Sequence, residues 1–135
     1  MVIVKSSTNI RRQYHRAFPI SCTCEICELG VHCSARHVIY RAECKTCSEV
    51  YIGVTTRPFK IRAKEHERNI TNWDTDTPFV PHLSRCPNPE KSITGFKWSI
   101  LDRGAGWKDS FIREAAHINS YNPKINRTKS GWIIT

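Results

Sequence analysis

The sequence predicts one α/β (α+β) domain, in which a small three-stranded antiparallel sheet is flanked by helices. Apolar and polar residues alternate as they do in strands at 38–42, 50–54 and 96–102. Two other stretches, 58–70 and 109–123, repeat apolar residues at the spacing of an amphipathic helix. A chain of 135 residues is long enough for one domain with a buried core, and a second full domain would not fit.

The composition is that of a globular protein with an excess of positive charge. The 21 Lys and Arg against 12 Asp and Glu give a net charge of +9, which favours a polyanionic partner, most commonly nucleic acid. The alternative is a solvated basic surface without a partner. No apolar run approaches the ~18 residues of a membrane-spanning helix, and the N-terminus lacks the apolar core of a signal peptide. We therefore expect no membrane partner and a nuclear or cytoplasmic protein, not a secreted one.

Residues 1–36 form a basic and then cysteine-rich N-terminal segment ahead of a domain at 37–135. The segment has no sustained period, so we expect a zinc-knuckle-like appendage that does not contribute to the core. The chain has seven cysteines and no secretory signal, which favours metal ligands over disulfides because cytosolic thiols stay reduced. Buried free thiols are the alternative interpretation.

The first two strands are predicted to form a hairpin. The polar stretch "CKTCSE" separates two alternating runs, which predicts an antiparallel pair joined by a turn that carries two cysteines. The alternating positions are Val38, Tyr40 and Ala42 in the first run and Val50, Ile52 and Val54 in the second.

Pro58 stands at the first position of the helix predicted over 58–70. Arg62 and His66 are four residues apart in this helix, so their side chains point the same way. The residues at apolar-stripe spacing are Phe59, Ala63, His66 and Ile70.

A turn-rich stretch follows the predicted helix. Within it "PFVPHLSRC" is consistent with a short helix that carries His82 and Cys86. The third strand, at 96–102, alternates Phe96, Trp98 and Ile100.

The last predicted helix begins at Asp109 or Ser110 and is stopped by Pro123. Glu114 lies inside its apolar stripe. A carboxylate on an inward face is costly unless it is paired or binds a metal, which makes Glu114 a candidate site residue. The residues of the expected inward stripe are Phe111, Ala115 and Ile118.

An ordered set of short phrases resembles the GIY-YIG nuclease family. "VIY" and "YIG" are ten residues apart, and "RAKEH", a glutamate in the last helix and "NPKIN" follow them. The resemblance covers residues 37 to 127. Two cysteines between the phrases, "PHL" at 81–83 and "IREAAHI" before "NPKIN" make it most like the endonuclease domain of Penelope-like retroelements.

Two positions depart from the family pattern. Val38 stands where the family usually has the glycine that gives it its name, which is tolerable because a strand residue there need not be glycine. One extra residue lies between Tyr51 and Arg62, which leaves Arg57 as the alternative to Arg62.

The resemblance implies a GIY-YIG nuclease fold and a metal-dependent endonuclease, a hydrolase that nicks DNA. Cutting a phosphodiester requires a nucleophilic water, a nearby base, positive charge at the phosphate and a metal. In the family pattern the two tyrosines flank the water, the arginine clamps the phosphate, and the glutamate binds Mg²⁺ or Mn²⁺. The implied catalytic residues are Tyr40, Tyr51, Arg62, His66, Glu114 and Asn126.

Each of these residues also has a purely structural interpretation. Strand tyrosines with satisfied hydroxyls are common in cores, and Arg62 could serve in an ion pair or on the surface. His66 could be a core histidine, Glu114 could be paired, and Asn126 could make a turn.

Two groups of cysteines predict structural Zn²⁺. Cys44, Cys47, His82 and Cys86 are arranged as two pairs, which matches a tetrahedral site. The related retroelement domains carry a similar Cys-Cys-His-His set, in which Cys86 would stand for a histidine. A second zinc site is predicted from Cys22, Cys24, Cys27 and Cys33, with His32 as a substitute ligand.

Two functions of different classes follow from the sequence. The first is a DNA-nicking endonuclease of mobile-element origin, and the second is a zinc-stabilised nucleic-acid-binding module without catalytic activity. The intact set of tyrosines, arginine and glutamate favours the endonuclease. No reverse transcriptase is present in the sequence. The chain is therefore expected to be either a standalone relative or the nuclease portion of a larger polyprotein with an upstream reverse transcriptase domain.

Overall fold

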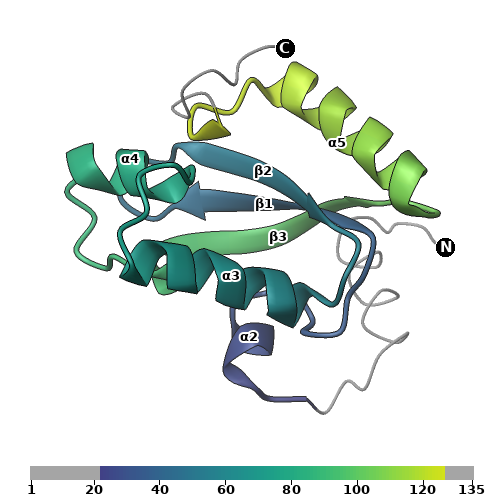
Figure 1. Cartoon of the computed structure of the whole chain (residues 1–135), viewed down its shortest axis with the longest axis horizontal. Helices are drawn as coiled ribbons and strands as arrows, with labels where there is room; N and C mark the ends of the chain where they lie inside the picture. The colour runs from purple at the N-terminus through teal and green to yellow at the C-terminus, as the bar shows by residue number, and fades with distance from the viewer. Residues whose placement is uncertain (1–21, 127–135) are drawn as a thin grey trace, which may run out of the picture.

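The computed structural model describes residues 22–126, so the basic part of the N-terminal segment, residues 1–21, and residues 127–135 lie outside the described residues. The described chain is α+β, with four α-helices around one three-stranded antiparallel sheet (Figure 1). This confirms the fold class predicted from the sequence. The strands are β1 (Val38–Cys44), β2 (Val50–Thr55) and β3 (Phe96–Arg103), in the order β2-β1-β3.

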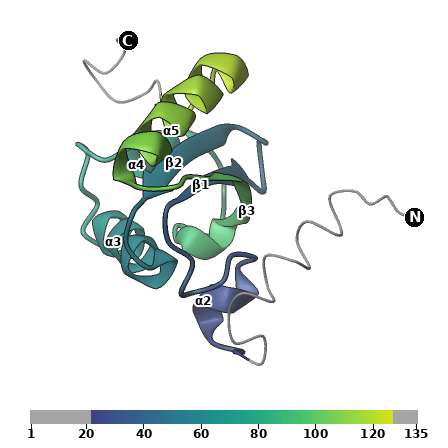
Figure 2. The same ribbon diagram turned by 90° about the vertical axis from the view of Figure 1, so that its right-hand side faces the viewer.

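The helices are α2 (Glu25–Glu28), α3 (Phe59–Thr71), α4 (Phe79–Arg85) and α5 (Trp107–Tyr121), with a 3-10 turn η1 at Ile93–Gly95. Helices α2 and α3 lie on one side of the sheet, and α5 runs along the other side (Figures 1 and 2). None of these helices is long and apolar enough to cross a membrane.

The strand register brings the two tyrosines to one face of the sheet. Tyr40 in the central strand β1 is paired with Gly53, and Ala42 is paired with Tyr51. On the other side of β1, Ala42 is paired with Trp98 of β3. Side chains alternate between the two faces, so Tyr40, Tyr51 and Trp98 all point toward α3. Ile52 consequently faces the opposite side, toward α5.

Helix α3 buries the stripe expected from its sequence. Phe59, Ala63, His66 and Ile70 are its buried residues, and they face the sheet. The helix begins at Phe59, one residue later than predicted, and Pro58 is its N-cap residue.

The inward stripe predicted for α5 is wrong. Phe111 is half exposed and Ala115 is also exposed, whereas Ser110 is completely buried. The helix begins at Trp107, earlier than predicted, and its inward face is rotated by about one residue, through Ser110 and Glu114. Small and polar side chains therefore face the sheet, and large apolar side chains point outward.

The described part of the N-terminal segment belongs to the core, where the sequence predicts an appendage. Ile26, Val31 and Ala35 are buried in the same hydrophobic cluster as Tyr40. Gly30 makes this packing possible, since a Cβ atom there would lie 2.6 Å from the carbonyl oxygen of Trp98, and its φ of +118° favours glycine. The segment continues into the fold without a separate core of its own.

Residues after α5 cover the free edge of the sheet. The amide of Ile125 donates to the carbonyl of Val50 at 3.0 Å. The side chain of Asn126 accepts from the Ile52 amide and donates to the Ile52 carbonyl, both at 2.8 Å. Asn126 thus replaces a neighbouring strand at this position of edge strand β2.

We expect Asn126→Ala to lower the free energy of unfolding by about 2–3 kcal/mol, because it leaves the buried amide and carbonyl of Ile52 unpaired. The matched control is Asn119→Ala, which changes an exposed residue of α5 and should stay within about 0.5 kcal/mol of the wild type. Urea denaturation measures both. Equal stability of the two variants would contradict the edge-covering role of Asn126.

Candidate functional site

The hydroxyl of Tyr40 lies at the centre of the candidate site. Its Oη is 2.7 Å from Nε2 of His66. The centroids of the Tyr40 and Tyr51 rings are 6.1 Å apart. Gly53 provides the space, since a Cβ atom there would lie 2.6 Å from Tyr40 Oη and 2.7 Å from Cε2 of Tyr51. The glycine of the "YIG" phrase is therefore required where two aromatic side chains pack on the strand.

His66 is neutral in this environment. It is buried among aromatic rings, and burial, together with the charge of Arg62, lowers the pKa of His66 well below its usual value. Its Nδ1 has no hydrogen-bond partner among the described residues. Nε2 thus makes the only hydrogen bond of the ring within that part of the chain, and this bond orients the imidazole toward Tyr40.

Burial raises the pKa of both phenols, but their environments differ. The pKa of Tyr40 is raised further by Tyr51, and Arg62 opposes this effect. The pKa of Tyr51 is raised by burial and by the charge of Glu114, whereas Arg62 and the neighbouring Tyr40 hydroxyl oppose the shift. Tyr51 also keeps 8% of its surface exposed, while Tyr40 is completely enclosed. Of the two phenols, Tyr51 is better placed to lose a proton and to reach solvent.

Arg62 enters the site from helix α3. Its side chain is 29% exposed, and Nη1 is 2.9 Å from Oε1 of Glu65. Burial disfavours its charge, but Tyr40, Tyr51 and Glu65 outweigh burial and raise the pKa of Arg62. Arg57 binds the same carboxylate and is half exposed. The pKa values of the phenols respond to Arg62, so the structure places Arg62, and not its alternative Arg57, beside the tyrosines.

Glu114 reaches the same place from the opposite side of the sheet. Burial raises the pKa of Glu114 to about 7, and Arg62 partly opposes the shift. Glu114 in turn raises the pKa of Tyr51. Helices α3 and α5 lie on opposite faces of the sheet (Figure 2), and the charges of Arg62 in α3 and Glu114 in α5 both act on Tyr51.

Asn126, the sixth residue of the predicted set, contacts only the backbone of Ile52 through its side-chain hydrogen bonds. It holds the strand that carries Tyr51 and Gly53. The structure thus brings three side chains, those of Arg62, His66 and Glu114, to the two phenols of Tyr40 and Tyr51. Asn126 is bonded to the backbone of the strand that carries Tyr51.

Four potential metal ligands meet beyond the end of β1. Cys44 ends the strand, Cys47 lies in the turn to β2, and His82 and Cys86 come from α4 and the residue after it. Their ligand atoms all lie within 4.8 Å of one another. The sulfurs of Cys44 and Cys86 are 3.7 Å apart, as are Cys47 Sγ and His82 Nε2. Sulfurs bound about 2.3 Å from one tetrahedral zinc are about 3.8 Å apart, so this predicted site suits a structural zinc ion.

Neighbouring polar groups support these ligands. Oε1 of Glu49 is 3.0 Å from Nδ1 of His82, which leaves Nε2 free to bind metal. The side-chain amide of Asn88 donates to the sulfur of Cys44 at 3.3 Å. Burial raises the pKa of Cys44, but the amides of residues 46 and 47, His82 and Asn88 together lower it to about 6. Glu49 and Asn88 were not predicted from the sequence, because neither stands at a ligand spacing and only the fold brings them to the site.

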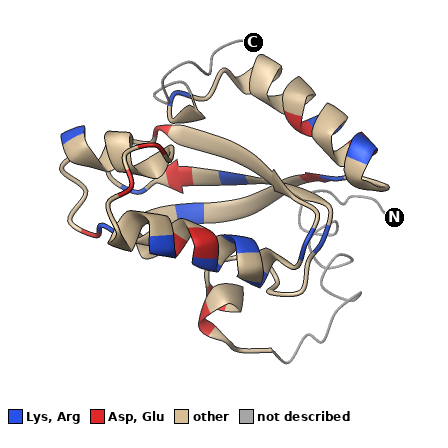
Figure 3. Ribbon diagram, in the orientation of Figure 1, with Lys and Arg blue, Asp and Glu red and all other residues tan. Residues whose placement is uncertain are grey.

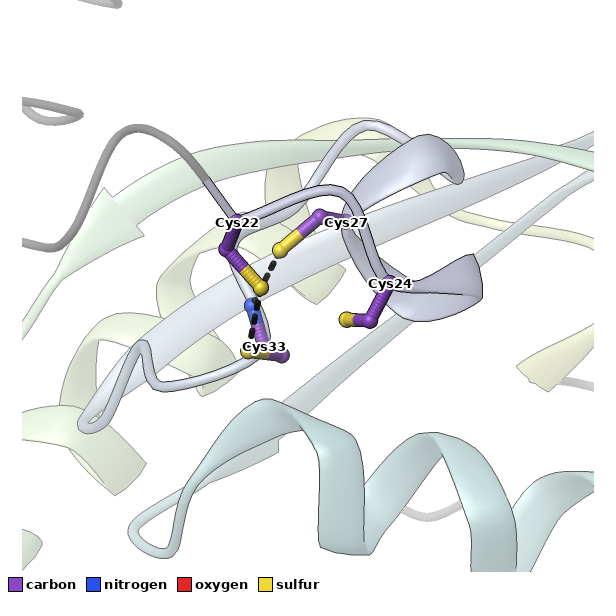
Figure 4. Close-up of side chains that lie close together, drawn as sticks. All are labelled: Cys22, Cys24, Cys27 and Cys33. Carbon is purple, nitrogen blue, oxygen red and sulfur yellow. Dashed lines mark hydrogen bonds between the residues drawn. The ribbon is translucent and has the colours of Figure 1, made fainter.

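A second group of ligands surrounds helix α2. In Figure 4 the four sulfurs of Cys22, Cys24, Cys27 and Cys33 point toward one another, and they lie within 4.8 Å of one another. Cys22 Sγ is 3.7 Å from Cys33 Sγ, and the amide of Cys33 donates to the sulfur of Cys27 at 3.4 Å. All seven cysteines are free thiols in the structure. This group also suits a structural zinc ion. His32, the predicted substitute ligand, is not among the residues whose ligand atoms meet there, and its Nδ1 accepts from the amide of Ser34.

Positive charge is spread unevenly along the chain. Lys60, Lys64 and Arg68 are exposed on α3, interspersed with Glu65 and Glu67 (Figure 3). Six of the 21 Lys and Arg, and none of the 12 Asp and Glu, lie in 1–21 and 127–135. Most of the net charge of +9 therefore belongs to the two ends of the sequence.

Comparison with known proteins found no matching family model, no matching curated protein and no matching solved structure.

The raised pKa of Glu114 predicts a pH dependence of stability. The folded chain holds a proton on Glu114 up to about pH 7, whereas its ordinary pKa is 4.5, so stability is lost as the pH rises between these values. Glu114→Gln stays neutral and should gain stability over the wild type from about pH 5 to pH 8. Urea denaturation without added Mg²⁺ measures the difference. Asp76→Asn, at an exposed position, is the control, and a pH-independent gain for Glu114→Gln would contradict the burial of its charge.

Cys47→Ser should remove one zinc ion per chain and lower the melting temperature. The reason is that structural zinc contributes on the order of 10 kcal/mol of folding free energy, as much as a domain of this size has in total. Elemental analysis and thermal denaturation measure the two effects. Ser48→Ala, at the exposed neighbouring position, should keep the zinc content of the wild type. A folded wild-type protein without zinc would refute the site.

Proposed function

We propose that this chain is a metal-dependent DNA endonuclease of the GIY-YIG type, most like the endonuclease domain of Penelope-like retroelements. The observation that supports this proposal most directly is the meeting of Tyr40, Tyr51, Arg62, His66 and Glu114, which come from four different elements. All five belong to the set that the family pattern implies.

The burial of charge at this place also supports a function. Arg62 and Glu114 are partly buried, yet Glu114 has no ion-pair partner within 4 Å among the described residues. Stability alone favours an apolar or fully paired arrangement. Ionisable groups with shifted pKa values gather at catalytic sites, where the cost of burying them is offset by function.

In the proposed mechanism Tyr51, as the phenolate, accepts the proton of the attacking water. We assign His66 the tautomer with its proton on Nε2, which lies 2.7 Å from Tyr40 Oη, so that the Tyr40 hydroxyl can donate toward the Tyr51 oxygen. This chain of donors and the charge of Arg62 stabilise negative charge on Tyr51. A phenol has a pKa of about 10 in water, and burial raises that of Tyr51, so a bound divalent cation would also be needed to favour the phenolate at neutral pH. The hydroxide formed from the water then attacks the phosphorus atom, the P–O bond to the leaving oxygen breaks, and that oxygen takes a proton from solvent.

Arg62 and Glu114 carry the remaining roles. Arg62 neutralises the charge that develops on the phosphate oxygens, and a scissile phosphate beside it would replace part of its interaction with Glu65. Glu114 would hold a divalent cation, Mg²⁺ or Mn²⁺, since hard cations take carboxylate ligands. Such a cation, when bound, would polarise the scissile phosphate and stabilise the leaving oxygen. The cysteine groups serve a different metal, because thiolates select zinc.

The rival function is a zinc-stabilised nucleic-acid-binding module without catalytic activity. Incubation with supercoiled plasmid distinguishes the two, since an endonuclease converts it to the nicked circle when Mg²⁺ is added and leaves it intact when Mg²⁺ is omitted. Omission is preferable to chelation with EDTA, because a chelator would also remove zinc from the cysteine groups.

Glu114→Gln and Arg62→Ala should each reduce nicking, in the case of Arg62→Ala by at least ~10²-fold, as loss of a preorganised charge at the transition state typically does. Binding to the same DNA should stay within a few fold, because most affinity comes from contacts to phosphates elsewhere. Arg68→Ala, on an exposed position of the same helix, is the matched control and should nick at nearly the wild-type rate. A loss of less than threefold for Arg62→Ala would exclude its proposed role.

DNA binding should weaken steeply with salt, because a chain with a net charge of +9 displaces counterions from the phosphates that it contacts. The logarithm of the affinity should fall with the logarithm of the salt concentration by about 0.9 per phosphate contact. Fluorescence anisotropy with labelled duplex DNA measures the slope. An affinity that does not change between low and physiological salt would contradict the proposed partner.

A further inference from the structure

The start of helix α3 lacks the usual cap. The residue before the helix is Pro58, which makes no side-chain capping hydrogen bond. The first amides of a helix have no partner within the helix and require acceptors from elsewhere. Here the amide of Phe59 donates to the carbonyl of Ala35 at 2.8 Å, and that of Lys60 donates to the carbonyl of Cys33 at 2.9 Å. The segment that ends the N-terminal cysteine group is therefore the cap of α3.

This capping segment is held in place by the cysteine group itself. Cys33 supplies one sulfur of the group and one of the two capping carbonyls. Its amide is bonded to the sulfur of Cys27, and the amide of Ala35 donates to the carbonyl of His32 at 3.1 Å. The carbonyl of Cys33 is thus tied directly to the cysteine group, while that of Ala35 follows two residues later and is also held by the burial of Ala35 in the core.

We propose that Cys22, Cys24, Cys27 and Cys33 bind a zinc ion that fixes the start of α3 and so positions Arg62 and His66 against the tyrosines. Arg62 lies within the first turn of the helix, and His66 lies one turn further along. A shift in the position of the first turn of α3 would therefore move the side chain of Arg62. The catalytic consequence rests on the proposed endonuclease function, whereas zinc binding and capping do not depend on it.

The chemistry of the group favours zinc over its alternatives. The sulfurs of Cys22 and Cys33 are 3.7 Å apart, far beyond the ~2.05 Å of a disulfide bond and close to the edge of a zinc tetrahedron. Helix α2 is only four residues long and Cys24 is exposed, so little packing orients its sulfur toward the others. A metal supplies the missing constraint, and four thiolates select zinc over harder cations.

The test uses the full chain in two matched variants, Cys24→Ser at this group and Cys47→Ser at the group beyond β1. Each should lose one of two zinc ions by elemental analysis. In amide hydrogen exchange followed by NMR, Cys24→Ser should speed the exchange of the Phe59 and Lys60 amides by on the order of tenfold. The amide of Cys86, which belongs to the other group, should not change. Cys47→Ser should give the opposite pattern.

Plasmid nicking then separates this inference from the proposed function. Cys24→Ser should lower the turnover rate with little change in DNA affinity, because Arg62 is displaced and the DNA-contacting surface is kept. If the wild type does not nick DNA, the endonuclease proposal fails, while zinc content and amide exchange still decide the capping role. Unchanged exchange of Phe59 and Lys60 in a Cys24→Ser protein that has lost one zinc would overturn the positioning role.

Cadmium substitution keeps the inference testable even where a variant does not fold. Wild-type protein refolded with ¹¹³Cd should show two resonances, one for a site of four thiolates and one for a site of three thiolates and one imidazole. A single resonance of the second kind would overturn the proposed site, as would a disulfide between any two of the four cysteines in protein purified under reducing conditions.

Discussion

The contact between the Tyr40 hydroxyl and the backbone at Gly53 is the constraint on which the site depends. With any side chain at position 53, the hydroxyl could not stay within 2.7 Å of His66, and the ring of Tyr51 would also have to move. The strand pairing of Tyr40 with Gly53 creates this space, so the register of β1 and β2 and the geometry of the phenols are specified together. The pairing of Tyr40 with Gly53 therefore fixes both the register of the hairpin and the aromatic cluster around His66.

Around this apolar centre the charged residues occupy positions that do not favour stability. His66 is buried and neutral, and burial disfavours the charged form of Glu114. Arg62 interacts both with Glu65 and with the two phenols. A protein selected only for stability would not keep such groups next to an aromatic core. A trade-off of this kind is characteristic of sites where function limits stability. The edge of the sheet is the place where the two helices can bring opposite charges near the same phenol.

The sequence predicted those features that local periodicity and ligand spacing encode. The three strands, the buried stripe of α3 and the short spacings within each ligand pair depend on neighbours in sequence, and the tetrahedral count of four joined the two distant pairs of one metal site. The inward face of α5 could not be predicted in this way, because the sheet accepts Ser110 and Glu114 there and leaves Phe111 outside. The bonds of Asn126 to Ile52 and of Glu49 to His82 join distant residues whose proximity no periodicity encodes. The core role of Val31 and Ala35 was missed because that segment has no period.

The small size of the sheet explains why one group of metal ligands lies before β1 and another lies beyond its end. Three strands cover little apolar surface, and folds with few strands commonly require an additional constraint such as a metal. One cysteine group joins the turn after β1 to α4, and the other joins α2 to the segment that caps α3. Each therefore adds a constraint to a short helix or a helix start on the Tyr40 side of the sheet, whereas α5 packs on the opposite face. The N-terminal group supplies the cap of α3, and α3 carries Arg62 and His66. A metal at that group would therefore link the stability of the fold to the geometry of the candidate site.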